Sequence, residues 1–271
     1  MPQRPIITLT TDFGIGSRYV AEMKGAILSI NPDASIIDLT HAIPPQDIRT
    51  AAAFLANTLP SFPTAAIHVV VVDPGVGSDR LVIYTEIGDR RLVCPDNGLV
   101  SNLADATNPR KIVAIEEPSY WRSPVSPTFH GRDIMGPVAA HLSLGLPPER
   151  LGTPRAGLTK LAIKKATKQA LTKDAGVAQR IEGEVIEVDS FGNLITNITA
   201  EQLADCPRDT SVTIRCDEHE TVGIYQTYSE QPPMTLVAIV GSNGHLELAI
   251  VDDSAKIMLG VGVGAAVSVA W

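Results

Sequence analysis

Two kinds of hydrophobic pattern divide the chain. In the first half, short β-branched runs alternate with stretches whose apolar residues recur at helical spacing. The apolar run at residues 67–72 suits the buried centre of a parallel sheet, where helices cover both faces. This alternation of strands and helices predicts an N-terminal α/β layered domain with a mainly parallel central sheet.

Individual elements of this domain follow from the same pattern. Helical spacing over residues 19–30 places Met23 and Ile27 on one face, and the helix is expected to end before Pro32. The strand candidates are residues 6–10, 35–39, 67–72, 81–85 and 91–94, the last two forming a hairpin, and the other helix candidates are residues 46–59, 97–106 and 133–146.

The second half reads as a smaller, all-β, barrel-like domain. Residues 156–179 are rich in Lys, Thr and Ala and poor in large apolar residues, which indicates a connecting helix or a solvated linker. After residue 180, short alternating runs are separated by turn residues. We therefore expect an α/β domain at 1–160, a linker at 161–180 and a β domain at 181–271. The strand candidates of the β domain are residues 183–188, 211–214, 236–240, 246–250 and 265–270.

Composition narrows the class of protein. The 271 residues carry 22 Lys plus Arg against 30 Asp plus Glu, a formal charge of −8, which argues against a nucleic-acid partner. No apolar run is long enough for a membrane span, and the N-terminus has no secretory pattern. Three irregularly spaced cysteines form neither a zinc pattern nor a disulfide framework. These features favour a cytoplasmic protein.

Asp12 is the first candidate for ligand binding. It follows the first strand candidate, and ligands of open α/β sheets bind outside the carboxyl ends of strands. A carboxylate there could accept hydrogen bonds from a ribose diol. The structural alternative is that Asp12 opens a turn or caps the following helix.

A second polar segment, residues 73–80, follows the most apolar strand candidate. It pairs an acid, Asp73, with a permanent cation, Arg80, around two glycines that permit close backbone approach. It lacks the Lys-Ser/Thr of a P-loop and the glycine spacing of a dinucleotide fold. As a pattern alone it is also an ordinary turn.

Two further segments carry candidate chemistry. His130 lies between an aromatic residue and a glycine, just before a helix candidate, where it could act as a general base, although a lone histidine is more often structural. Asp189 and Asn193 lie in the β domain in what would otherwise be a hairpin loop.

Taken in order, these segments give the chain a resemblance to a known family. It resembles the S-adenosyl-L-methionine hydroxide adenosyltransferases, relatives of the bacterial fluorinase and chlorinase, over nearly its whole length. The motifs that carry the resemblance are TTDFG (10–14), DPGVGSDR (73–80), PDNG (95–98), FHGRD (129–133), DSFGN (189–193) and GSNGHLELA (241–249).

The resemblance implies a reaction and an assembly. Members of the family have an α/β domain followed by a smaller β domain, form trimers, and bind S-adenosyl-L-methionine where the N-terminal domain of one subunit meets the C-terminal domain of its neighbour. In the branch that uses water, an acid, an arginine and a histidine lie beside the nucleophile, and they correspond to Asp73, Arg80 and His130. The implied products are adenosine and L-methionine.

The resemblance also implies substrate-binding residues. Asp12 corresponds to the carboxylate that binds the ribose hydroxyls, and Asp189 corresponds to the acid that binds the methionine ammonium. The remaining substrate-binding positions are Ser17, the adenine contacts Phe191 and Asn193, and Ser242 at the methionine end. No cofactor and no metal is implied, and the six histidines show no metal-ligand spacing.

Differences from the halogenases favour water as the nucleophile. Asp73 stands where the fluorinase has a halide-pocket tyrosine, Gln46 stands where it has a pocket tryptophan, and the halogenase insertion is missing. Two alternatives remain open: a halide-dependent adenosyltransferase, and a non-catalytic protein that binds S-adenosyl-L-methionine or adenosine.

Overall fold

The chain folds into two units, each with its own hydrophobic core. The computed structural model describes residues 4–162, 164–173 and 176–271, and it divides into Met1–Ala162 and Ile163–Trp271. No helix within these described ranges is long and apolar enough to cross a membrane.

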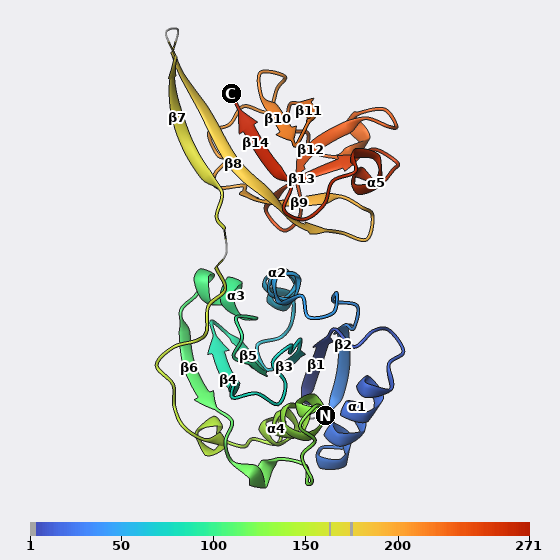
Figure 1. Ribbon diagram of the computed structural model, residues 1–271, viewed down its shortest axis with the longest axis vertical. Helices are drawn as coiled ribbons and strands as arrows, with labels where there is room; N and C mark the ends of the chain where they lie inside the picture. Colours follow the sequence, from blue (N-terminus) through green and yellow to red (C-terminus); the bar gives the residue numbers. More distant parts are fainter. Residues whose placement is uncertain (1–3, 163, 174–175) are drawn as a thin grey trace. The chain divides into compact units, whose positions relative to one another are not determined.

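A six-stranded sheet forms the centre of the N-terminal unit (Figure 1). Its order is β2-β1-β3-β5-β4-β6, in which β2, β1, β3 and β5 run parallel and β4 is antiparallel to both of its neighbours. The mainly parallel sheet predicted from the apolar pattern is therefore confirmed. The strands are β1 (Ile6–Thr11), β2 (Ser35–Thr40), β3 (Ile67–Val71), β4 (Val82–Ile87), β5 (Arg90–Pro95) and β6 (Pro109–Ala114).

Helices cover both faces of this sheet. Val69 of β3 belongs to the core beneath α1 (Arg18–Ile30) and α4 (Gly136–Ser143). The next residue, Val70, belongs to the core beneath α2 (Ile48–Thr58) and α3 (Ser101–Ala106). Successive side chains of a strand point to opposite faces, so β3 is buried on both sides, which explains its continuous apolar run. Short 3₁₀ turns lie at Leu59–Ser61, Pro118–Tyr120 and Pro148–Leu151.

The structure differs from the pattern at two predicted helices. The helix expected at 97–106 begins only at Ser101, because Gly98 adopts a positive φ and the Asn97 side chain donates to the carbonyl of Val72. The helix expected at 133–146 is a π-helical turn, Gly131–Met135, followed by α4. Pro137 has no N–H to continue the regular hydrogen-bond ladder, so the helix changes its winding there.

The C-terminal unit is a strongly curved antiparallel sheet, as expected. The order is β11-β10-β14-β8-β9-β13-β12, with β7 added to the first part of β8. Its main core includes Val185, Leu246 and Val267, and a small second cluster is formed by Val237, Ala249 and Val251. The elements are β7 (Thr167–Lys173), β8 (Gly176–Val188), β9 (Leu194–Thr199), β10 (Thr213–Cys216), β11 (His219–Val222), β12 (Leu236–Val240), β13 (His245–Ile250), β14 (Ala266–Ala270), α5 (Ala255–Leu259) and a 3₁₀ turn at Tyr228–Glu230.

The interpretation of residues 156–179 as a connecting helix or solvated linker is wrong for part of that segment. β7 pairs with β8 as a hairpin, with Thr167 opposite Glu182. β7 has no partner on its other side among the described residues, and an edge strand needs no strongly apolar sequence. Residues 163, 174 and 175 of the expected linker 161–180 lie outside the described residues.

Candidate functional site

Two of the candidate acids leave the central sheet at the same edge. β1 and β3 are adjacent and parallel, and Thr11 lies opposite Val71 in their register. Asp12 follows the end of β1, and Asp73 follows the end of β3 after one further residue. Because carboxyl ends of neighbouring parallel strands meet at one edge, the sheet itself places both carboxylates at the position where such folds bind ligands.

Asp73, Arg80 and His130 form one connected group. Nε of Arg80 donates to Oδ1 of Asp73 at 2.7 Å, and Nη2 donates to the other carboxylate oxygen, so the ion pair is bidentate. Nη2 of Arg80 also lies 3.0 Å from Nδ1 of His130. The side chains of Asp73 and Arg80 are 4% and 10% exposed. The structure thus brings together three residues that are up to 57 positions apart in sequence.

The contact with Arg80 determines the tautomer of His130. A guanidinium donates hydrogen bonds and cannot accept them, so Nδ1 is the acceptor and a neutral ring carries its hydrogen on Nε2. Burial, followed by the charge of Arg80, lowers the pKa of His130 below its ordinary 6.5, while Asp73 and Asp133 act in the opposite direction. At neutral pH the ring is therefore uncharged and presents an Nε2–H donor.

One nitrogen of Arg80 remains without a partner. Nη1 is buried and makes no hydrogen bond within the described part of the chain. A buried donor without a partner costs about 1–3 kcal/mol, more for a charged group, so its position favours a bound polar ligand. The group therefore offers two donors, Nη1 of Arg80 and Nε2 of His130, beside the carboxylate of Asp73.

The segment after His130 is held by a fully buried carboxylate. Asp133 accepts from Nε and Nη2 of Arg132 at 2.7 and 2.9 Å and from the backbone N–H of Ser126 at 2.9 Å. At Gly131, an added Cβ would lie 3.1–3.2 Å from atoms of Met23 and Val71. The glycine lets the π-helical turn pack against α1 and β3, which fixes the position of the histidine.

Asp12 does not cap the helix that follows it, which was one of the structural alternatives for this residue. Its Oδ2 accepts from the backbone N–H of Gln46 at 2.8 Å, and Gln46 has a φ of 66°, an unusual value for a residue with a side chain. The side chain of Ser17 is the one that caps α1, accepting from the N–H of Tyr19 at 3.3 Å. The substrate-binding role assigned to Ser17 by resemblance stays a prediction.

The loop 189–193 of the C-terminal unit is closed by Asp189. Oδ1 accepts from the backbone N–H groups of Phe191 and Asn193 at 2.9 and 2.8 Å, and Oδ2 accepts from the Asn193 amide at 3.0 Å. Gly192 has a φ of 85°, which permits the tight turn. As a result, Phe191 stands 78% exposed while Asn193 is buried beneath it.

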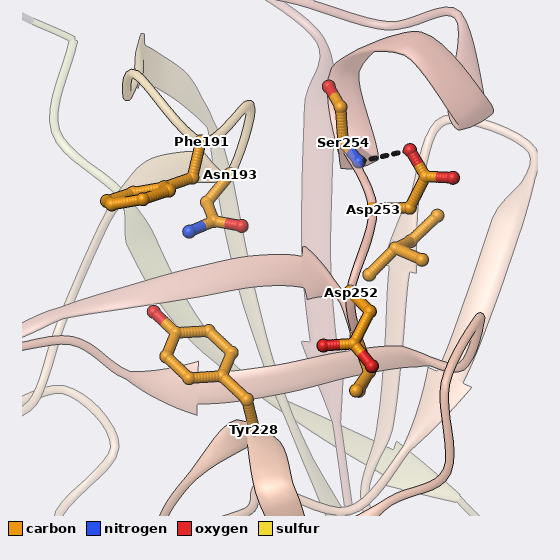
Figure 2. Close-up of a pocket in the computed structure, with 8 residues that line it drawn as sticks. Phe191, Asn193, Tyr228, Asp252, Asp253 and Ser254 are labelled. Carbon is orange, nitrogen blue, oxygen red and sulfur yellow. Dashed lines mark hydrogen bonds between the residues drawn. The ribbon is translucent and has the colours of Figure 1, made fainter.

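An open pocket of about 500 Å³ lies beside this loop (Figure 2). Phe191, Asn193 and Tyr228 stand on one side, and residues 252–254 lie across from them. Figure 2 shows the two aromatic rings separated by a gap, with the Asn193 amide near it. Sequence reasoning identified Phe191 and Asn193 but missed Tyr228 and the opposite wall. The sequence did contain one signal for the opposite wall, a serine followed by a helical stretch, which is typical of a helix cap. In the structure the Ser254 hydroxyl caps α5 by accepting from the N–H of Ile257 at 3.3 Å.

Two glutamates lie close enough to Asp189 for its charge to act on them. Glu247 is buried and accepts a hydrogen bond from the hydroxyl of Tyr228 at 2.5 Å, while Oε2 of Glu187 is buried without a partner among the described residues. Burial first, and then the charge of Asp189, raises the pKa of both glutamates. Ser242 is exposed in the turn before β13, next to Gly241, where an added Cβ would lie 2.7 Å from Glu247.

The predicted residues thus fall into two sets, one in each unit. Asp12, Asp73, Arg80 and His130 belong to the N-terminal unit, and the set around Asp189 belongs to the C-terminal unit. Over residues 4–162, 164–173 and 176–271, no group of three His, Cys, Asp or Glu side chains could hold a metal ion. The expectation of a reaction without metal or cofactor stays a prediction.

Comparison with known proteins gives consistent matches along the chain. Family models described as the SAM hydroxide adenosyltransferase N-terminal and C-terminal domains match residues 7–152 and 183–268. The (R)-S-adenosyl-L-methionine hydrolase of Thermus thermophilus is 38% identical over 271 residues, covering 96% of this chain and 97% of its own. The fluorinase of Nocardia brasiliensis is 25% identical and covers 72% of each chain. A crystal structure of an uncharacterized conserved protein from Thermotoga maritima superposes with a TM-score of 0.86 at 33% identity, covering 97% of this chain and 99% of its own.

Proposed function

The chain belongs to the SAM hydroxide adenosyltransferase family, and on that premise we propose that it hydrolyses S-adenosyl-L-methionine to adenosine and L-methionine. Water attacks C5′ of the ribose, and the thioether of methionine leaves. The observation that carries the proposal is the connected Asp73–Arg80–His130 group, which leaves Nη1 of Arg80 without a partner among the described residues and Nε2 of His130 as the hydrogen-bearing nitrogen of the ring.

This group suits a water or hydroxide nucleophile. Nη1 of Arg80 and Nε2 of His130 donate to the water oxygen, and the guanidinium charge stabilises the negative charge that develops as the proton leaves. A halide at the same point would lie against the Asp73 carboxylate, whereas water can donate a hydrogen to it. The arrangement therefore favours hydrolysis over halogenation.

The proposed step balances without a metal or cofactor. The water oxygen forms a bond to C5′, and the C5′–S bond breaks with its electron pair passing to the sulfonium sulfur, which becomes the neutral thioether. The water proton passes to Asp73, whose oxygens have lone pairs beyond those used by Arg80, and then to solvent. A neutral leaving group needs no general acid, so the residues act only on the nucleophile.

The remaining predicted residues would hold the substrate. The free oxygen of Asp12 would accept the ribose hydroxyls, since the other oxygen is occupied by Gln46 N–H. The gap between Phe191 and Tyr228 suits a flat adenine ring, and the Asn193 amide would form hydrogen bonds with the edge of that ring. Asp189 would bind the methionine ammonium, with Glu247 behind it and Ser242 at the same end.

We also propose where and in what form the enzyme acts. The chain would assemble as a homotrimer in which the C-terminal unit of one subunit completes the substrate site of its neighbour, as the resemblance implies. The substrate would be a small molecule, and neither nucleic acid nor membrane takes part. Three free, buried cysteines suit the reducing cytoplasm.

Incubation with S-adenosyl-L-methionine in H₂¹⁸O tests the proposal. We expect the heavy oxygen to appear at the 5′ position of adenosine by mass spectrometry, with an equal amount of methionine. Parallel incubations with chloride and fluoride should yield no 5′-halogenated nucleoside. Formation of that product would support the halogenase alternative, and calorimetric binding without any product would support a non-catalytic binding protein.

A further inference from the structure

The segment after β2 holds the loop that carries Asp12. His41 is the centre of this contact: its Nδ1 lies 2.9 Å from Oγ1 of Thr11, and its carbonyl accepts from the N–H of Gly14 at 2.8 Å. Five residues further on, Gln46 N–H donates to the Asp12 carboxylate itself. Three contacts therefore fix the Asp12 loop on both sides of the acid.

The hydroxyl of Thr11 links His41 to the backbone beyond Asp12. Oγ1 of Thr11 accepts from the N–H of Phe13 at 3.2 Å, so it can donate its own hydrogen to Nδ1 of His41. Asp12 lies between the two residues joined by this bond. Loss of the imidazole would release the Thr11 hydroxyl and with it the contact that limits rotation of the Asp12 backbone.

His41 is itself anchored on its far side. Nε2 lies 3.2 Å from Oδ1 of Asp38, whose other oxygen accepts from Nζ of Lys24 on α1 at 2.6 Å. The imidazole is only 10% exposed. A series of contacts thus runs from α1 through the end of β2 to the Asp12 loop; Nδ1 makes the hydrogen bond to Thr11, whereas Nε2 lies near Asp38 without a hydrogen bond to any described residue.

We propose that His41 is a positioning residue, which sets the Asp12 carboxylate at the place where the ribose diol of the substrate is bound. The inference rests on the proposed function, because it takes the ribose as the partner of Asp12. His41 touches no reacting atom and acts only through Thr11 and Gly14. A small displacement of a binding group is costly, so removal of the contact weakens ribose recognition without removing Asp12.

The two ring nitrogens allow a matched pair of variants. Asparagine places a polar atom near Nδ1 and can keep the contact with Thr11, whereas glutamine reaches toward Asp38 and loses it. We expect His41→Ala and His41→Gln to raise the Kd for adenosine roughly 10–100-fold. This is the change expected when the Asp12 carboxylate loses one or two hydrogen bonds to the ribose hydroxyls. His41→Asn should restore most of the affinity. Thr11→Val should behave like His41→Ala, and Thr11→Ser like the wild type.

Comparison of adenosine with 2′-deoxyadenosine, by calorimetry on the full-length protein, separates positioning from stability. Wild type should prefer adenosine, and the preference should fall in His41→Ala toward that of Asp12→Ala. A purely structural role would lower the folded fraction and the apparent kcat while leaving this preference and the KM unchanged, and that result would overturn the inference alone. If the wild type shows no preference between the nucleosides, the ribose assignment of Asp12 fails, and the inference fails with it. Absence of hydrolysis with the preference intact would instead refute only the proposed reaction.

Discussion

Nη2 of Arg80 lies 3.0 Å from Nδ1 of His130, and this contact determines which nitrogen of the neutral ring carries the hydrogen. Because the guanidinium can only donate, the neutral imidazole must accept at Nδ1 and carry its hydrogen at Nε2. A general base at Nε2 would need that nitrogen to be free of hydrogen, which would place a hydrogen on Nδ1 against Arg80. The geometry therefore favours His130 as a donor that orients the nucleophile, with Asp73 accepting the proton.

The pH dependence of the reaction follows from this arrangement. Protonation of His130 puts a second N–H against Arg80 and brings two positive charges together, so activity should fall as the pH falls through the pKa of the ring. Since burial and Arg80 lower that pKa, we expect the acidic limb of kcat/KM to lie below pH 6.5. His130→Asn, whose amide oxygen can still accept from Arg80, should remove the contribution of His130 to this limb and lower the plateau about 10²-fold. A limb centred above pH 6.5, or one that is unchanged in the variant, would contradict the assignment.

Replacement of Arg80 by lysine tests whether the shape of the guanidinium matters as well as its charge. Lysine keeps the positive charge but cannot contact both oxygens of Asp73, His130 and a water at once. We expect kcat to fall roughly 10²–10³-fold, with a much smaller change in KM. Arg110→Lys, at an exposed ion pair with Asp89, is the matched control and should leave both constants unchanged. A near wild-type kcat in Arg80→Lys would mean that only the positive charge of Arg80 matters and not the shape of its guanidinium.

Much of the fold was predictable because buried strands have a simple pattern. The run at β3 indicated a parallel strand covered on both faces, and its end placed Asp73 at the ligand-binding edge. β6 and β7 escaped prediction because each is an edge strand, where polar residues are tolerated. β9 was also missed although it lies between β8 and β13, so its position in the sheet does not account for it. Edge strands take their pairing from a neighbour, which a local pattern does not reveal.

The sequence named the candidate site residues one by one, but it did not predict how they are arranged. Asp73 and Arg80 came from one motif and His130 from another. Arg80 contacts both of the other residues only because the π-helical turn that follows His130 packs against β3 and α1. Tyr228 gave no signal in the sequence, and Glu247 lies in the motif 241–249 but received no role of its own. Tyr228 lines the pocket and the buried Glu247 on β13 does not, and only the hydrogen bond between them links the glutamate to the pocket.

Gly192 tests the aromatic pocket without altering any side chain that lines it. At this position an added Cβ would lie 2.0 Å from Oγ of Ser254, and the φ of 85° is unfavourable for alanine. We expect Gly192→Ala to displace the loop 189–193, lower the melting temperature and raise the Kd for adenosine about tenfold or more, since the strain alone is of order 1–3 kcal/mol. Gly264→Ala is the control, because Gly264 has a φ of 91° but no atom near the added Cβ. It should lower the melting temperature and leave adenosine binding unchanged, and equal losses of affinity in both variants would argue against a pocket at this loop.

A buried histidine away from the site should control stability in acid. His68 on β3 is 1% exposed, and its Nδ1 is hydrogen-bonded to Oγ1 of Thr8 at 2.8 Å. Burial, with smaller contributions from Arg90 and Arg91, lowers the pKa of His68 to about 4. The unfolded chain takes up this proton near pH 6.5 and the folded chain only near pH 4, so stability is complete above pH 6.5 and is lost as the pH falls between these values. The shift corresponds to a loss on the order of 3 kcal/mol in the free energy of unfolding.

Denaturant unfolding at several pH values between 7 and 4 measures this loss directly. The double variant Thr8→Val with His68→Leu replaces both hydrogen-bonding partners by apolar groups, so neither is left unpaired in the core. The other titrating groups are the same in both proteins, and the difference between the two pH profiles therefore isolates His68. We expect the variant to lose markedly less stability than the wild type on going from pH 6.5 to pH 4. Parallel profiles would mean that His68 takes up its proton in the folded state as readily as in the unfolded chain, and acid unfolding would then have to begin at other groups.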